Sequence, residues 1–116
     1  MDALLSVTLE AHLPERNLHR FYEIRIGRDL FGVWILTVRF GRVGHWGRTA
    51  TFSSPDRTHL YAELRPLLLR RLSAPQRIGC KYFFQNGFCS AESLWEEFLP
   101  DEEICQALTI PELLAG

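Results

Sequence analysis

Two stretches of alternating apolar residues lie close together in the first half of the chain, and they constrain the fold more than any other feature. In Arg20–Ile26 every second residue is apolar, and a second alternation runs over Val33–Phe40. Side chains of a β-strand point alternately to its two faces, so each stretch predicts a strand with one buried face. Because only a short segment beginning at Gly27 separates them, we expect an antiparallel pair.

A glycine-rich segment follows the second of these strands. Glycine recurs at every third position from Gly41 to Gly47, and glycine permits the positive φ angles of a tight turn. We therefore expect a turn here and a returning strand at 49–52. Short apolar runs predict two further strands, at 4–9 and at 78–84.

The segment that follows residue 53 predicts the main helix. Ser54 can accept a hydrogen bond from the first helical amides, and Pro55 suits the first helical position. Leucines then recur at helical spacing and form a stripe that can pack on a sheet. They are Leu60, Leu64, Leu67, Leu68 and Leu72. Pro66 lies within this stripe, so we expect the helix to kink or restart there.

The last part of the chain predicts short helices. Ser93 and Glu96 have capping-box spacing, and Pro100-Asp101 marks a second helix start. The apolar side chains here that are able to pack are Trp95, Phe98, Leu99, Ile104 and Leu108. We therefore expect a domain at 1–84 and an acidic helical extension at 85–116, either packed on the domain or appended to it.

The formal net charge of −1 hides a separation of charge along the chain. Residues 16–81 contain all 13 basic residues against four acidic ones, a net charge of +9, whereas residues 82–116 contain seven acidic residues and no basic one. Twelve of the 13 basic residues are arginine, which binds phosphate through paired hydrogen bonds and stacks on bases. The middle of the chain therefore favours an anionic partner such as nucleic acid.

Other classes of function are disfavoured. The Gly-x-x-Gly-x-x-Gly spacing lies between strands and is not a dinucleotide-binding pattern. The three cysteines and four histidines lack paired metal-ligand spacing, so we expect no metal and no cofactor. Nothing positions a cysteine–histidine pair for catalysis, so we expect no enzyme. No apolar run is long enough to cross a bilayer and no signal peptide is recognisable, so we expect a cytoplasmic protein, with association to the nucleoid as an alternative.

Residues 17–52 resemble the WGR domain, a small module named for a Trp-Gly-Arg signature. The resemblance lies in Arg20-Phe21-Tyr22-Glu23-Ile24, Leu30-Phe31-Gly32-Val33-Trp34 and Phe40-Gly41-Arg42-Val43-Gly44, with Gly47 and Phe52 at the expected distances. The chain is similar to stand-alone, bacterial-type WGR proteins, related to the module of poly(ADP-ribose) polymerases. The resemblance covers roughly residues 4–82 and implies an α+β fold, a curved antiparallel sheet packed against one main α-helix, here followed by short C-terminal helices.

Three positions depart from the family's pattern. Phe40 replaces the signature tryptophan and offers a smaller ring without an N–H donor. Arg48 stands where the family often has a neutral polar residue, which adds positive charge. A basic run and Gly-Tyr often follow the family's helix, and Arg77-Ile78-Gly79-Cys80-Lys81-Tyr82 matches that pattern only approximately.

The resemblance implies a non-enzymatic module that binds DNA, or alternatively RNA, through backbone and strand-end contacts without strong sequence specificity. A chain of this length has no room for the polymerase domain, so no ADP-ribosylation activity is expected. The turn and the strand before it gather cations for phosphate and rings for an exposed sugar or base. The candidate binding residues are Arg39, Phe40, Arg42, His45, Trp46 and Arg48.

Several alternatives stay open. Arg42 could brace the turn through carbonyl contacts, and Trp46 could pack on its own sheet while the arginines pair with tail carboxylates. The acidic tail could cover the arginine surface, dock a protein through Trp95 and Phe98, or only complete the core. The second functional hypothesis is a protein-interaction module that uses the sheet surface or the acidic C-terminal helices.

Overall fold

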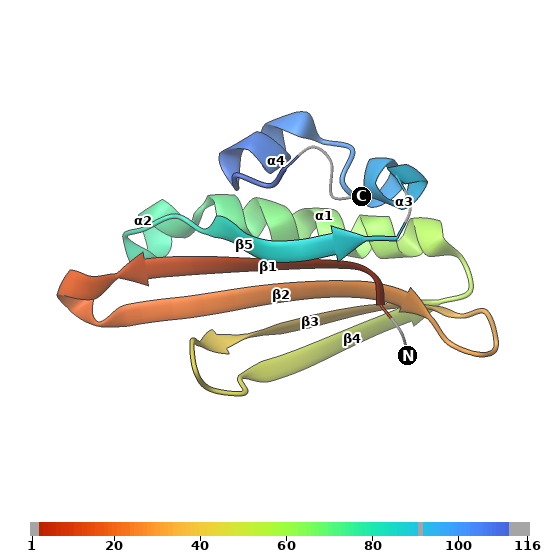
Figure 1. The fold of residues 1–116 in the computed structure, drawn as a ribbon, viewed down its shortest axis with the longest axis horizontal. Coiled ribbons are helices and arrows are strands. Elements are labelled where there is room, and N and C mark those ends of the chain that lie inside the picture. Colours follow the sequence, from red (N-terminus) through yellow and green to blue (C-terminus); the bar gives the residue numbers. More distant parts are fainter. Residues whose placement is uncertain (1–2, 91, 112–116) are drawn as a thin grey trace.

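One five-stranded antiparallel sheet forms the body of the protein, in the strand order β4-β3-β2-β1-β5 (Figure 1). The structure is a computed structural model, and it describes residues 3–90 and 92–111. The strands are β1 (Ala3–Leu13), β2 (Leu18–Arg28), β3 (Trp34–Arg42), β4 (Arg48–Ser54) and β5 (Phe83–Cys89). Together with one main helix and short C-terminal helices, this sheet confirms the expected α+β class.

The two alternating stretches pair as expected. β2 and β3 are antiparallel, with Tyr22 opposite Phe40 and Ile24 opposite Val38. Their shared apolar face is buried, apart from Phe40 at the end of β3, which keeps 37% of its surface exposed. Trp34 is 8% exposed at the other end of β3, so it belongs to the core. The alternation in the sequence therefore determined both the pairing and the buried face.

The expected outer strands differ in extent from those observed. β1 continues to Leu13 because its alternation persists, with Leu9 and Ala11 buried. The strand expected at 78–84 is wrong for its first part, since a short helix α2 (Ala74–Ile78) ends at Gly79 in a left-handed conformation with φ +88°. Proline near the start and glycine at the end favour such a short helix.

The main helix α1 (Arg57–Leu72) lies against β3 and β4. Its N-cap is Asp56, whose carboxylate accepts a hydrogen bond from the backbone N–H of Thr58 at 2.9 Å. The expectation that Ser54 caps the helix is wrong, because its hydroxyl instead accepts a hydrogen bond from the backbone N–H of Asp56 at 3.0 Å. The helix also does not restart at Pro66, because Pro66 and Ala62 are exposed and water can satisfy the carbonyl that loses its partner.

The C-terminal helices complete the core. α3 (Glu92–Phe98) and α4 (Glu102–Ala107) contact α1, and α3 also contacts β1 and β5 (Figure 1). All five apolar side chains expected to pack are buried, and the ring of Phe98 lies 6.1 Å from that of Trp34. Docking of a partner through Trp95 and Phe98 is therefore wrong, because both rings are enclosed by the protein itself.

This packing makes the C-terminal segment part of the stability of the whole fold. Replacing the fully buried Phe98 by alanine (Phe98→Ala) should lower the free energy of unfolding by about 3–5 kcal/mol, from lost burial and the cavity left behind. Denaturant unfolding measures the effect. Glu96→Ala, at an exposed position of the same helix, is the control and should stay within about 0.5 kcal/mol of the parent. Equal effects of the two changes would contradict this packing.

Candidate nucleic-acid interface

Strand β3 divides the predicted binding residues between the two faces of the sheet. Arg39 lies opposite Glu23, whereas Phe40 lies opposite Tyr22, whose side chain is in the core. Because successive side chains of a strand point to opposite faces, Arg39 lies on the face away from α1. By the same register Phe40, Arg42 and Arg48 belong to the face that carries α1. The six candidate residues therefore do not form one surface.

Arg39 is the centre of a cluster on the face away from α1. Its guanidinium lies 4.6 Å from the ring centre of Phe21 and 4.9 Å from that of Trp46. It also donates to the carbonyl oxygen of Trp46 at 2.8 Å and pairs with the Glu23 carboxylate at 3.3 Å. We call Phe21, Arg39 and Trp46 the Trp46 stack. Trp46 itself remains 77% exposed, so it does not pack into its own sheet.

The glycine turn allows the Trp46 stack to form. Gly47 has a φ of +81°, which favours glycine. A Cβ at this position would overlap the carbonyl oxygen of Phe40 and lie 2.9 Å from Cζ of Phe21. The ring of Phe21 therefore occupies space that only glycine leaves open. Phe21 is 6% exposed as a result, although it lies on the polar side of β2.

Arg42 holds two turns of the sheet together. Its guanidinium donates to the backbone oxygen of Asn17 at 2.9 Å and to the Asn17 side-chain oxygen at 3.2 Å. Asn17 follows the short helical turn η1 (Pro14–Arg16) and has a left-handed φ of 51°. The carbonyl contact expected as an alternative for Arg42 is present, but it is made with the β1–β2 turn and not with the glycine turn. The same side chain also lines a cleft.

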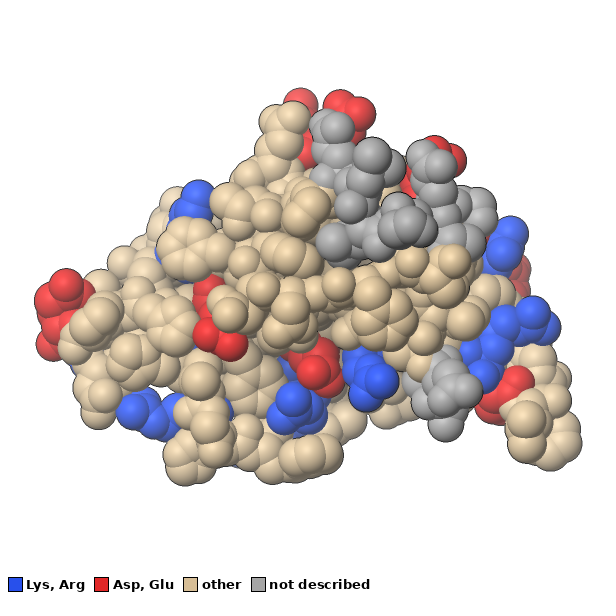
Figure 2. All heavy atoms as spheres, in the orientation of Figure 1, with Lys and Arg blue, Asp and Glu red and all other residues tan. Residues whose placement is uncertain are grey.

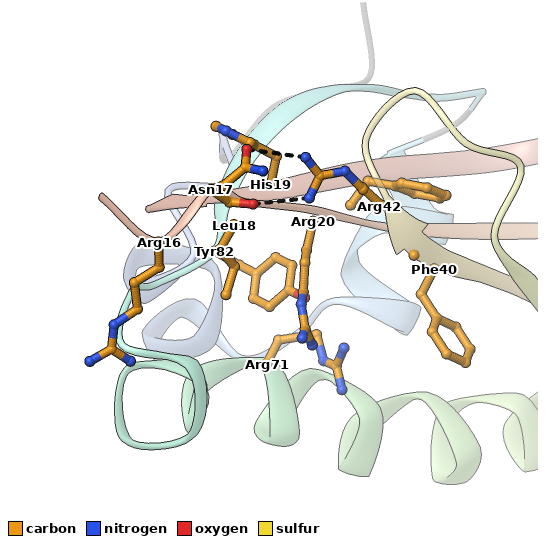
Figure 3. A pocket seen from close by; sticks show the side chains of 11 residues that line it. Arg16, Asn17, Leu18, His19, Arg20, Phe40, Arg42, Arg71 and Tyr82 are labelled. Carbon is orange, nitrogen blue, oxygen red and sulfur yellow. Dashed lines mark hydrogen bonds between the residues drawn. The ribbon is translucent and has the colours of Figure 1, made fainter. Parts of the chain in front are cut away.

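Four arginines surround one cleft beside Phe40 and Tyr82 (Figure 3). The cleft has a volume of about 490 Å³ and lies between the β1–β2 turn, the end of β3 and the C-terminal part of α1. We call Arg16, Arg20, Arg42 and Arg71 the arginine cleft. No carboxylate is among the described residues that line it, so its positive charge is not neutralised within the cleft. Such a concave cationic surface attracts anions more strongly than isolated charges do.

Arg71 is the most enclosed of these cations. Its guanidinium stacks 4.2 Å from the ring centre of Tyr22 and 5.5 Å from that of Tyr82. Its Nε atom is buried and has no hydrogen-bond partner among the described residues. Burial raises the pKa of the Tyr22 hydroxyl, and the charge of Arg71 partly offsets that rise.

Sequence reasoning missed most of the cleft. Arg16, Arg20 and Arg71 come from three different elements, and only the fold brings them to Arg42. Tyr82 could have been identified from the sequence, because it stands near the Gly-Tyr of the family's pattern. Of the predicted residues, His45 and Arg48 are exposed on or beside the turn, and neither forms a salt bridge within the described part of the chain.

The acidic C-terminal segment pairs with a different part of the protein. Glu97 binds Arg57 at 2.8 Å, and Asp101 binds Arg65 at 3.2 Å, so both carboxylates pair with arginines of α1. Acidic side chains gather at the top of the molecule over α3 and α4 (Figure 2). Among the described residues, no salt bridge joins the segment after residue 82 to the arginine cleft or to the Trp46 stack.

The fold and the cleft define a small α+β module with a cationic surface at one end of an antiparallel sheet. The family model of the WGR domain matches residues 5–69, more than half of the chain, and the protein belongs to the WGR domain family. WGR domains are binding modules rather than catalytic ones, and they bind nucleic acid in proteins such as poly(ADP-ribose) polymerases. No match was found among the curated proteins.

Within residues 3–90 and 92–111, no three metal-ligating side chains of His, Cys, Asp or Glu lie together in a way that could hold an ion. No helix in the described ranges is long and apolar enough to span a bilayer.

The close approach at Gly47 can be tested with a matched pair of glycines. Gly47→Ala should cost about 1–3 kcal/mol in backbone strain, and its overlap with Phe40 and Phe21 should add to that cost. Gly44→Ala is the control, since Gly44 has a similar φ of +89° but no atom within 4 Å of the place a Cβ would take, and it should cost only the same backbone strain of about 1–3 kcal/mol without the added overlap. Thermal and denaturant unfolding compare the two. A Gly44 variant as unstable as the Gly47 variant would contradict the packing of Phe21.

Proposed function

We propose that this WGR protein is a non-enzymatic module that binds DNA, or alternatively RNA, by its sugar-phosphate backbone near a strand end. The observation that carries the proposal is the arginine cleft, four guanidiniums around one concavity without a lining carboxylate among the described residues. Phosphate contacts give affinity without sequence information, so binding should show little sequence specificity.

The side chains of the cleft have separate roles in this proposal. Arg16 and Arg20 are exposed and form no salt bridge in the described structure, so they are available to phosphates. Arg71 lines the cleft, and stacking on the Tyr22 ring holds its guanidinium in place there. Phe40 lines the cleft and stacks 6.0 Å from Tyr22, a position suited to contact with a sugar.

The turn supplies the remaining contacts. His45 lies in the β3–β4 turn and Arg48 begins β4, and both are exposed and can approach a phosphate that leaves the cleft. Arg39 has less charge to offer, because Glu23 already pairs with it. We therefore assign Arg39 to positioning Trp46, and Arg42 to both bracing the cleft and binding a phosphate.

A protein-interaction role is the second candidate. Its support is the row of exposed carboxylates that α3 and α4 keep outside the salt bridges with α1, at Glu96, Glu102 and Glu103. A basic partner surface would suit them. A basic protein partner would not bind in the arginine cleft, so the cleft favours nucleic-acid binding as the main function.

Salt dependence and one substitution test the cleft. With about three to four phosphates neutralised on duplex DNA, log K should fall with log salt at a slope of roughly −3 to −4. Arg20→Ala should weaken binding on every sequence and reduce the steepness of this slope by about 1, since one phosphate contact is lost. Fluorescence anisotropy of labelled duplexes at several salt concentrations measures both quantities.

Arg65→Ala is the matched control for that experiment. It also removes one positive charge, but Arg65 already pairs with Asp101 and does not line the arginine cleft. Its slope should equal that of the parent. Equal losses in the two variants would mean that overall charge, not the cleft, binds DNA, and no binding at ~50 mM salt would refute the function itself.

A further inference from the structure

We propose that the free face of Trp46 is a stacking site for one unpaired nucleobase, so that the preferred ligand carries a single-stranded segment or overhang. This inference rests on the proposed function, and it adds the class of nucleic acid that the module selects. The sequence alone placed Trp46 against a sugar or a base without distinguishing the two. The geometry of the Trp46 stack favours the base.

Trp46 differs from the other two tryptophans of the chain. Trp34 and Trp95 are 8% and 6% exposed and belong to the core, whereas Trp46 is 77% exposed. An indole left this open contributes little to burial, and its large ring is the best stacking surface among the side chains. A ring that the fold does not use for its own core is available to a ligand.

The ring is also held in place before any ligand binds. Arg39 lies 4.9 Å from the ring centre, and the same guanidinium donates to the Trp46 carbonyl at 2.8 Å. Glu23 and the ring of Phe21 fix that guanidinium in turn. A ligand that stacks on the indole therefore orders few additional torsions, which lowers the entropy cost of binding.

The charge around the ring selects a flat, neutral group. The ion pair with Glu23 offsets the charge of Arg39, so the Trp46 stack presents a ring more than a cation. A nucleobase matches such a surface, and a phosphate does not. Within a duplex each base is stacked between its neighbours, whereas an unpaired base presents both of its faces to the indole.

The Trp46 stack and the arginine cleft lie close enough to act on one strand. The β3–β4 turn and the β1–β2 turn are at the same end of the sheet (Figure 1). Phe21 belongs to the Trp46 stack and also lines the cleft. A strand held by its phosphates in the cleft can therefore place one of its bases on Trp46 where it bends around the end of the sheet.

Four DNA ligands separate the stacking site from the phosphate site. They are a blunt duplex, the same duplex with a three-nucleotide thymidine overhang, the same overhang with abasic nucleotides, and a short oligothymidine. The abasic overhang keeps the phosphates and removes only the bases. We expect the thymidine overhang to bind roughly 5- to 150-fold more tightly than the abasic one, the range expected for one stacked base.

Trp46 variants assign that difference to the indole. Trp46→Ala should reduce the affinity for the thymidine overhang to that for the abasic one, and the variant should fold as the parent does because the ring is outside the core. Trp46→Phe keeps a smaller ring and should retain part of the preference. Phe31→Ala removes another exposed ring, 89% exposed between β2 and β3 at the other end of the sheet, and as the control it should keep the preference fully. Binding of the thymidine overhang should also quench the tryptophan fluorescence of the parent protein, and this quenching should be absent in Trp46→Phe.

The outcomes distinguish this inference from the proposed function. Equal binding of the thymidine and abasic overhangs, without quenching, would overturn the stacking site while phosphate binding stands. An overhang preference that persists in Trp46→Ala would also overturn it, since another group would then read the base. No binding of any of the four ligands would overturn the stacking site together with the proposed function.

Discussion

The register between β2 and β3 is the constraint on which the other features of this protein depend. It places Arg20 opposite Arg42 and Tyr22 opposite Phe40, so that both guanidiniums and the Phe40 ring line the cleft while Tyr22 lies in the core. A slip of one residue would reverse every side chain and expose the core face of both strands to water. The burial of Ile24 and Val38 therefore fixes the register, and with it the position of every cleft residue on these strands.

The separation of charge along the sequence becomes a separation in space. Carboxylates of the C-terminal segment neutralise Arg57 and Arg65 in the first part of α1, but in the described structure they form no salt bridge with Arg70 and Arg71 in its last turn. The negative end of the helix dipole also stabilises cations there. Burial lowers the pKa of Arg77, and the charges of Arg70 and Arg71 lower it further. The acidic segment therefore neutralises two arginines of α1, and in the described structure its salt bridges do not reach the arginine cleft.

The sequence predicted the parts of the fold that depend on local pattern, and it predicted less of the site. Alternation identified β2 and β3, and helical leucine spacing identified α1, because both patterns reflect burial along one element. The N-cap at Asp56 was missed because Ser54, Asp56 and Thr58 all offer plausible local hydrogen bonds. The arginine cleft was missed for a different reason. Its arginines come from several elements that lie far apart in the sequence. An arginine on a helix is expected to face water unless the strand end opposite it is known.

Phe40 replaces the signature tryptophan, and Trp46 in the turn does not take over its position. Phe40 points to the side of α1 and lines the arginine cleft, whereas Trp46 lies on the opposite face with Arg39. The tryptophan in the turn is therefore not a displaced copy of the signature residue, because a base on Trp46 and a sugar on Phe40 would approach from different sides of β3. A strand that contacts both must bend around the end of the sheet. Single-stranded nucleic acid bends there at little cost, whereas a rigid duplex with a persistence length of about 150 base pairs does not.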